Sequence, residues 1–235
     1  PVLEGGKRIG YGARAINEGG LQSVPKLVFP GGALIGCSAG FLNVPRIKGT
    51  HNAMKSGMLA AEAAYAAVQA GRQHDELADY AEGWKKSWIY RDLYKVRNVK
   101  PSLKWGMLPG TILGGMHMWL NDLGLGALVG WTQHHGKPDN EYLKPAAEMP
   151  KIVYPRYDGV ISFDKLSSVF LSNTNHVEDQ PVHLQLRDPA IPVGVNLAEY
   201  DGPESRYCPA GVYEFVDAET GSDKRLQINA QNCVH

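Results

Sequence analysis

The strongest constraint in this sequence is an ordered succession between residues 26 and 70: short apolar segments, a loop of small residues, and a long run of helix formers. The run from Gly49 to Ala70 is rich in alanine and predicts a helix. Segments 26–29 and 33–36, around Pro30-Gly31-Gly32, predict two short strands. A strand, a tight loop and a helix in this order place the loop backbone beside the first N–H groups of the helix.

The loop is suited to the close approach of a flat ligand. Gly36, Ala39 and Gly40 carry little or no side chain, so backbone can come near a large planar group. The helix start after Gly49 offers unpaired N–H groups and the positive end of the helix dipole, which suit an anionic oxygen. Taken alone, the short pattern also fits a strand, loop and helix of any α/β protein.

The longer string from Leu34 to Met54 resembles the second flavin-binding motif of the glutathione-reductase-like flavoproteins. Cys37 stands where most of those families place an aspartate. The variant Gly-Cys-Ser-Ala-Gly-Phe, followed by Asn-Val-Pro-x-Ile-Lys-Gly-Thr-His, is similar to the electron-transfer flavoprotein–ubiquinone oxidoreductase family in particular. The resemblance implies bound FAD, with contacts from Gly36, Ala39, Gly40, Phe41, Asn43, Val44, Gly49 and Thr50.

The segment from residue 5 to residue 20 resembles the same family. Its Gly-x-Gly-x-x-Ala match at residues 10–15 lacks the apolar strand and apolar helix that a dinucleotide fingerprint needs, so we reject that interpretation. The resemblance places this segment beside the flavin ring and the quinone pocket. It makes Asn17 a candidate donor to the flavin ring, although a polar turn residue fits the sequence nearly as well.

Two cysteines suggest a second cofactor. Cys208 and Cys233 lie 25 residues apart, and such a pair alone is more often two buried thiols than metal ligands. Their surroundings, Cys-Pro-Ala-Gly-Val-Tyr and Asn-Ala-x-Asn-Cys-Val-His, resemble the ferredoxin-like end of the same family. The resemblance implies that both bind a [4Fe–4S] cluster, that two further cysteines lie past residue 235, and that Tyr213 tunes the cluster through a hydrogen bond. Cys37 is not a cluster candidate, and zinc at Cys233 and His235 is disfavoured because no second Cys/His pair lies nearby.

Residues 105–120 form an apolar run without a formally charged residue. Its 16 residues are fewer than the roughly 20 that a spanning helix needs. The alternatives are a buried core helix and a helix that enters one leaflet, with nearby lysines at lipid headgroups. The family resemblance favours monotopic membrane contact, because ubiquinone comes from lipid. Basic residues precede the run at Lys95, Arg97, Lys100 and Lys104.

The remaining pattern is mixed. A helix is predicted over 74–94, with Trp84 and Trp88 on one face, and a short one over 163–171. Strands are predicted at 182–187, 212–216 and 226–228, and a boundary near 145–155. Lys plus Arg equals Asp plus Glu at 24 each, so the net charge gives no indication of nucleic acid, and we expect no such partner.

The expected fold class is α/β (α+β), in three segments. Residues 1–100 are the C-terminal part of a glutathione-reductase-like FAD domain with a quinone-site segment, 101–150 are a membrane-contacting and linker region, and 151–235 are a ferredoxin-like iron–sulfur domain. We expect the C-terminal part of a longer enzyme, an electron-transferring-flavoprotein dehydrogenase that passes electrons from reduced electron-transfer flavoprotein to ubiquinone. We name no catalytic nucleophile, and the piece alone is expected to be inactive.

Two alternatives stay open. One is a related FAD-dependent reductase or hydroxylase without a cluster, and the other is a docking fragment that holds neither cofactor. The expected location is peripheral and monotopic, on the bacterial cytoplasmic membrane or the matrix side of the mitochondrial inner membrane.

Overall fold

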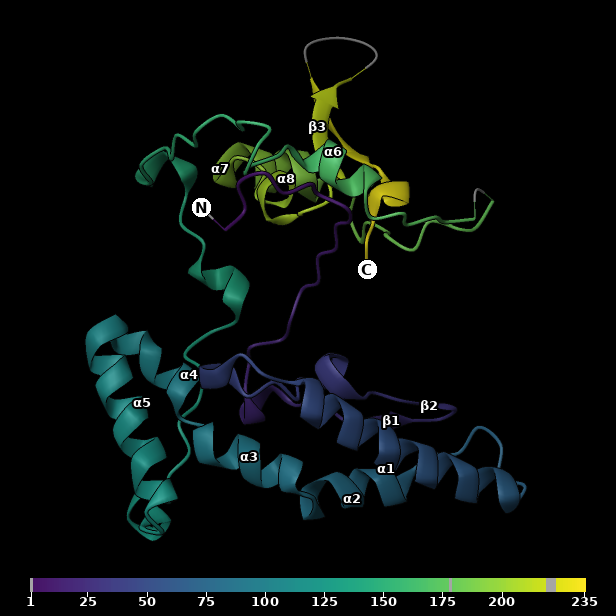
Figure 1. Cartoon of the computed structure of the whole chain (residues 1–235), viewed down its shortest axis with the longest axis vertical. Helices are drawn as coiled ribbons and strands as arrows, with labels where there is room; N and C mark the ends of the chain where they lie inside the picture. Colours follow the sequence, from purple (N-terminus) through teal and green to yellow (C-terminus); the bar gives the residue numbers. More distant parts are fainter. Residues whose placement is uncertain (1, 178, 219–222) are drawn as a thin grey trace. The chain divides into compact units, whose positions relative to one another are not determined.

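The computed structural model describes residues 2–177, 179–218 and 223–235. The chain divides into two compact units (Figure 1). Unit 1 comprises Pro1–Arg14 and Asp139–His235, and unit 2 comprises Ala15–Pro138. Both mix helices with short strands, in agreement with the predicted class.

Unit 2 begins with a small hairpin. Strand β1 (Val28–Phe29) pairs antiparallel with β2 (Gly32–Ala33), and the pairing extends to the Leu34 N–H, which donates to the Leu27 carbonyl over 2.8 Å. The two predicted strands are therefore confirmed but shorter than expected. The 3-10 turn that follows begins at Gly36 (Gly36–Ala39), the last residue of the second predicted strand.

Helix α1 (Thr50–Gln69) confirms the helix predicted over 49–70. Its packed face carries Asn52, Ser56, Ala63 and Ala67, which are buried in unit 2. The opposite face is also apolar but exposed. It consists of Met54, Met58, Tyr65 and Val68, spaced by four, seven and three residues along one side of the helix.

The prediction of a single helix over 74–94 is wrong. The structure has two helices, α2 (Ala78–Lys86) and α3 (Trp88–Val96), with a break at Ser87. Ser87 is extended (ψ 170°), and its hydroxyl accepts from the Ile89 N–H as the N-cap of α3. Because the helix breaks there, Trp84 and Trp88 do not share a face: Trp84 is buried and Trp88 is 38% exposed.

These helices enclose the core of unit 2, which contains Phe41, Tyr80, Trp84, Ile89 and Leu93. Figure 1 shows α1 along α2, with α3 continuing from α2. The Tyr80 hydroxyl donates to the Leu34 carbonyl over 2.7 Å, which ties α2 to the end of the hairpin. Burial raises the pKa of Tyr80 to about 12.

A buried arginine organises the rest of unit 2. Arg97 follows α3, and its guanidinium lies 3.6 Å over the Tyr94 ring. Nη2 donates to the carbonyls of Val129 and Trp131, both over 3.1 Å, and Nε donates to the Thr132 hydroxyl over 3.0 Å. The guanidinium therefore fixes the returning segment 129–132 against α3, and burial lowers its pKa.

Helix α5 (Met107–Asp122) packs on the short helix α4 (Val99–Ser102) through glycines. A Cβ at Gly110 would lie 2.6 Å from the Ser102 carbonyl oxygen, and one at Gly114 would lie 3.1 Å from the Val99 Cα. The helices can approach this closely only because both positions lack a side chain.

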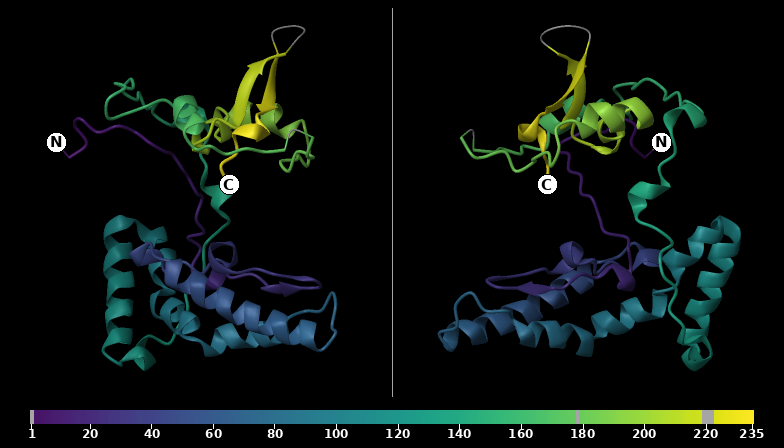
Figure 2. Two further views of the ribbon diagram at one scale, coloured as in Figure 1. Left: turned by 45° about the vertical axis from the view of Figure 1, so that its right-hand side comes forward. Right: turned by 180° about the vertical axis from the view of Figure 1, so that it is seen from behind.

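Unit 1 is built around a hairpin of β3 (Tyr213–Asp217) and β4 (Lys224–Ile228), paired antiparallel with Phe215 opposite Leu226 (Figure 2). Helix α6 (Lys165–Phe170) confirms the helix predicted over 163–171, and the two strands confirm the predictions at 212–216 and 226–228. The strand predicted at 182–187 is wrong, since that segment is irregular.

Short elements complete the fold. Unit 1 also contains α7 (Ala198–Tyr200), α8 (Glu204–Tyr207) and a π-helix at Pro192–Leu197. The other 3-10 turns are Leu21–Ser23, Val44–Arg46, Leu103–Trp105, Gly126–Val129, Asp139–Tyr142, Ala146–Glu148 and Ala230–Asn232.

The division into units differs from the predicted segments. The boundary falls between residues 138 and 139, ahead of the expected 145–155, and residues 1–14 cluster with the C-terminal residues. The N-terminal segment joins unit 1 because Arg8 is bound there. Its Nη1 donates to the Ser168 hydroxyl over 2.8 Å, and its guanidinium lies 3.9 Å over the Phe163 ring. The cofactor roles of the three segments stay predictions.

The glycine contact of α5 can be tested with a matched pair of substitutions. Gly110→Ala should destabilise the protein by roughly 1–3 kcal/mol, because the new methyl group meets backbone. Gly115→Ala, on the same helix with no atom within 4 Å of the added Cβ, should stabilise it by about 0.5–1 kcal/mol. Urea unfolding of both variants measures the difference, and equal effects would contradict the packing described.

Candidate functional site

The two predicted cluster ligands come together in unit 1. Cys208 follows α8, and Cys233 follows the 3-10 turn at the end of β4. Both are free thiols, each 7% exposed, and they share one small apolar core with Ala210 and Val212. Residues 25 positions apart meet because the β3–β4 hairpin folds the chain back on itself.

Hydrogen bonds join the two cysteine loops. The Asn229 N–H donates to the Val212 carbonyl over 2.7 Å, and the Asn229 side-chain amide donates to the Gly211 carbonyl over 3.2 Å. The Asn232 amide reaches the same Gly211 carbonyl over 3.4 Å. The Val212 N–H points at the Cys208 sulfur, with N and Sγ 3.4 Å apart. An N–H group aimed at a ligand sulfur stabilises negative charge on it.

Tyr213, the predicted cluster-tuning residue, lies at the start of β3 beside this pair. Its pKa is raised, first by burial and then by the nearby Cys208 and Cys233. A phenol that keeps its proton remains a hydrogen-bond donor, and the sulfur atoms of an iron–sulfur cluster or of its cysteine ligands can accept a hydrogen bond. This surrounding is compatible with the predicted role.

Unit 1 supplies two candidate cluster ligands. A [4Fe–4S] cluster needs four ligands. Among the described residues, no group of three or more Cys, His, Asp or Glu side chains could hold a metal ion. His176 lies near Cys233, but its Nε2 is bound to the Cys233 carbonyl over 2.8 Å. The two thiols match the soft ligands that iron–sulfur clusters prefer.

The N-terminal segment contributes to this unit. The Tyr11 hydroxyl donates to the carbonyl of Pro209, the residue after Cys208, over 3.1 Å. Segment 5–20 was expected beside a flavin ring. The structure divides it, with residues 5–14 in unit 1 and Asn17 in unit 2.

The predicted flavin loop lies in unit 2 and has the expected backbone. Gly36 (φ 57°) and Gly40 (φ 79°) both adopt left-handed conformations. The Gly36 N–H donates to the buried Ser56 hydroxyl over 3.0 Å, and a Cβ on Gly36 would lie 3.1 Å from the Ala53 Cβ. Ala39 and Phe41 are buried, and the loop packs against α1.

Asn43 has an unusual environment. Its side chain is fully buried, yet neither its Nδ2 nor its Oδ1 has a hydrogen-bond partner. Its backbone pairs with Lys48, which closes the loop ahead of the helix. A buried amide without partners is rare and indicates a missing ligand, water or chain segment. Val44 and Gly49 are half-buried, and Thr50 is exposed at the helix start.

Asn17 lies over the same loop. Its Nδ2 donates to the Cys37 carbonyl over 2.8 Å, and its backbone N–H lies 3.4 Å from the Cys37 sulfur. The structure therefore brings all the predicted flavin residues together around segments 17, 36–44 and 49–50.

Asp92 of α3 is a further residue of this site that no sequence motif indicated. Its carboxylate is within 3.4 Å of the side-chain nitrogens of His51 and Asn52, and 3.8 Å from the Arg46 guanidinium. Asn52 also donates to the Phe41 carbonyl over 3.0 Å, so Asp92 supports both the loop and the helix start. No sequence signal could link it to them, because about 40 residues separate these positions.

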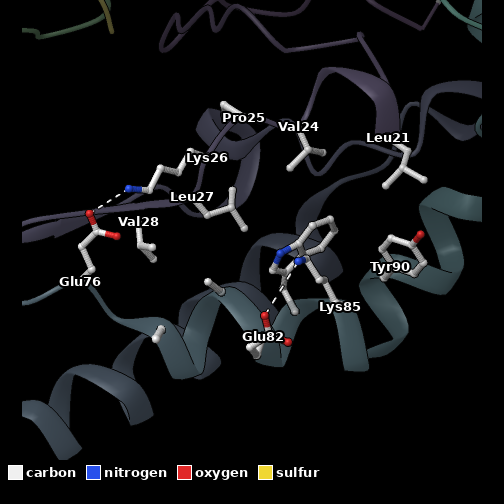
Figure 3. Close-up of a pocket in the computed structure, with 13 residues that line it drawn as sticks. Leu21, Val24, Pro25, Lys26, Leu27, Val28, Glu76, Glu82, Lys85 and Tyr90 are labelled. Atoms are coloured by element: carbon white, nitrogen blue, oxygen red, sulfur yellow. Dashed lines mark hydrogen bonds and ion pairs between the residues drawn. The ribbon is translucent and has the colours of Figure 1, made fainter.

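Unit 2 also has an open groove of about 640 Å³ between the segment before β1 and helix α2. Figure 3 shows Leu27 and Val24 on one side, and the ion pairs Lys26–Glu76 and Lys85–Glu82 at its rim. None of the predicted site residues lines it.

The apolar run 105–120 forms most of α5, which leaves one face to solvent. Leu108, Ile112 and Trp119 are 61–73% exposed, and the buried face holds Gly110, Gly114 and His117. No helix among the described residues is long and apolar enough to cross a membrane. Of the basic residues before the run, Arg97 is 1% exposed and cannot meet lipid headgroups, while Lys95 pairs with Asp122.

Known proteins resemble this chain along its whole length. Residues 159–235 match the family model described as "Electron transfer flavoprotein-ubiquinone oxidoreductase, 4Fe-4S". The chain is 56% identical over 242 residues to the mitochondrial electron transfer flavoprotein-ubiquinone oxidoreductase of Rattus norvegicus and equally to that of Homo sapiens. It is 57% identical over 234 residues to the Pseudomonas aeruginosa protein of that name.

These alignments cover 99–100% of this chain but only 39–42% of the relatives. The chain thus spans about two fifths of the length of the relatives that it matches. The identity extends through both units, and the family model covers the region that contains Cys208 and Cys233. The chain therefore belongs to the electron transfer flavoprotein-ubiquinone oxidoreductase family.

Proposed function

We propose that this chain is part of an oxidoreductase that passes electrons from reduced electron-transfer flavoprotein, through a [4Fe–4S] cluster and FAD, to ubiquinone. One observation carries the proposal: Cys208 and Cys233 share a buried core in the region that matches the iron–sulfur family model. Electron transfer depends on position and redox tuning, so no catalytic nucleophile is required.

For the cluster, we infer that Cys208 and Cys233 are two of the four ligands. A bound [4Fe–4S] cluster accepts and releases one electron at a time. The protein contributes two thiolates, an apolar surrounding that excludes water, and donors directed at sulfur. The Val212 N–H already lies 3.4 Å from the Cys208 sulfur, and the Tyr213 hydroxyl is a second candidate.

Substitution of the ligands tests this assignment. In the full-length protein, Cys208→Ser or Cys233→Ser should reduce the iron content from about four per chain to below one, because each removes a thiolate. Cys37→Ser, in the other unit, is the control and should keep the iron. Iron and acid-labile sulfide analysis, with EPR of the reduced protein, gives the readout. Full iron content in both ligand variants would reject the assignment.

For the flavin, we infer that nine residues form part of a FAD site of the glutathione-reductase-like type: Asn17, Gly36, Ala39, Gly40, Phe41, Asn43, Val44, Gly49 and Thr50. The unpartnered amide of Asn43 supports this, since a ligand's polar edge would satisfy it. The left-handed glycines Gly36 and Gly40 support it as well, because they keep side chains out of the loop. The exposed stripe of α1, Met54 to Val68, offers a surface for the remainder of such a domain in the longer relatives.

The Asn43→Leu variant tests whether the unpaired Asn43 amide binds FAD or is simply an unsatisfied buried polar group. Leucine has the same number of side-chain heavy atoms with the same branching, and no polar atom. If Asn43 binds FAD, the full-length variant should hold FAD at least about tenfold more weakly, through the loss of one buried hydrogen bond. The apoprotein should unfold at the same or a higher urea concentration, because a buried unpaired amide is gone. Unchanged FAD affinity by fluorescence titration would exclude the contact.

For the membrane, we infer that the exposed face of α5 enters one leaflet, which would bring the enzyme to its lipid-soluble quinone. Leu108, Ile112 and Trp119 lie on one side of this helix, opposite its packed glycines. Trp105 and Trp131, both 50% exposed, suit the membrane interface. The proposed location is peripheral and monotopic, on the bacterial cytoplasmic or mitochondrial inner membrane.

Vesicle binding tests the α5 surface. Ile112→Asp with Trp119→Asp should reduce partition of the full-length protein into phosphatidylcholine–phosphatidylglycerol vesicles at least about tenfold, since two large apolar side chains no longer enter lipid. Ala66→Asp with Gln69→Asp, two exposed positions of α1, adds the same charge and should leave binding nearly unchanged. Co-sedimentation measures vesicle binding of both double variants. An equal loss of binding in both would show that the added negative charge, and not the loss of apolar side chains from α5, weakens binding.

Two other functions remain distinguishable by cofactor content. A related FAD-dependent reductase or hydroxylase would contain flavin without iron. A docking segment would hold neither cofactor, and we expect the chain by itself to behave in that way. Its described residues include no group of three or more side chains that could hold a metal ion.

A further inference from the structure

Lys165 is the first residue of α6 and points at the loop of Cys208. Its ammonium nitrogen donates to the carbonyl of Ser205 over 2.9 Å and to the carbonyl of Cys208 itself over 3.2 Å. The side chain is half-buried, and two backbone acceptors fix the position of its charge.

These contacts leave the charge uncancelled, because both acceptors are neutral carbonyls. The carboxylates next in sequence to these groups, Asp164 and Glu204, make hydrogen bonds to other residues. Asp164 binds the backbone N–H and the hydroxyl of Ser167. Glu204 accepts from the Asn196 amide over 2.8 Å with Oε1, and its Oε2 is buried without a partner.

We propose that Lys165 is a tuning residue that raises the reduction potential of the cluster bound at Cys208. The proposal rests on the proposed function of Cys208 as a ligand. Reduction adds one electron, and hence one negative charge, to the cluster and its thiolates. A fixed positive charge bound at the backbone carbonyl of the ligand residue stabilises that reduced state more than the oxidised one. Lys165 is not itself a ligand, and it acts on the cluster through its charge.

Three substitutions of Lys165 separate the effect of its charge from the effect of its hydrogen bonds. Arginine keeps the charge and can donate to both carbonyls. Glutamine keeps a donor but no charge, and methionine keeps only the length and apolar stem. If the charge matters, Lys165→Arg should resemble the native protein, and Lys165→Gln and Lys165→Met should both become harder to reduce.

The experiment is a redox titration of the full-length, cluster-loaded protein, followed by EPR of the reduced cluster. At the native midpoint potential, the ratio of reduced to oxidised cluster should fall at least about threefold in Lys165→Met and Lys165→Gln, from the loss of one nearby charge. It should stay near one in Lys165→Arg. Lys151→Met removes an exposed lysine of the same unit and serves as the matched control.

Each outcome decides the proposal. An unchanged ratio in Lys165→Gln overturns it, even if Lys165→Met loses its cluster and cannot be titrated. An equal fall in Lys165→Arg also overturns it, because the effect would then come from local packing. Failure of the native protein to bind iron, or full iron in the Cys208→Ser variant, would instead reject the proposed function on which Lys165 depends.

Discussion

The structure of unit 2 depends on one buried guanidinium. Arg97 binds the carbonyls of Val129 and Trp131 and the hydroxyl of Thr132, and so closes a loop of more than 30 residues that contains α5. A buried charge is stable only when its donors are satisfied, and here backbone oxygens do this. Because Arg97 holds the return of the chain, α5 can pack through glycines on one face and leave its large apolar side chains exposed on the other.

The two candidate cofactor sites follow a common physical pattern. In each, a short hairpin or turn brings chain segments together, and polar side chains hold them. The half-buried Asn229 joins the cysteine loops, and the buried Ser56 and Asn52 bind the backbone of the predicted flavin loop. In each, the described residues leave groups without a partner. Unit 1 offers two free thiols, and unit 2 buries the Asn43 amide without a hydrogen-bond partner. We propose that a bound cofactor satisfies these groups in each unit.

The exposed apolar surfaces of α1 and α5 look alike in composition but differ in setting. The α5 face contains Trp119, and the exposed Trp105 precedes the helix, which favours a membrane interface. The α1 stripe adjoins the flavin loop and is flanked by the polar Lys55 and Glu62, which favours protein as its cover. Mean hydropathy cannot separate the two cases, because it ignores what lies beside each face.

Local propensity and motif order were enough to predict the helix over 49–70, the small-residue loop before it, the cysteine pair and the family. They could not predict the break at Ser87, where a hydroxyl cap outweighs helix propensity, or the irregular course of 182–187. Three features follow from the folded chain alone: Arg97 is buried, Asp92 supports the predicted flavin loop, and Lys165 reaches Cys208. These contacts join residues about 30 to 43 positions apart, where the geometry of folding selects partners that no local pattern encodes.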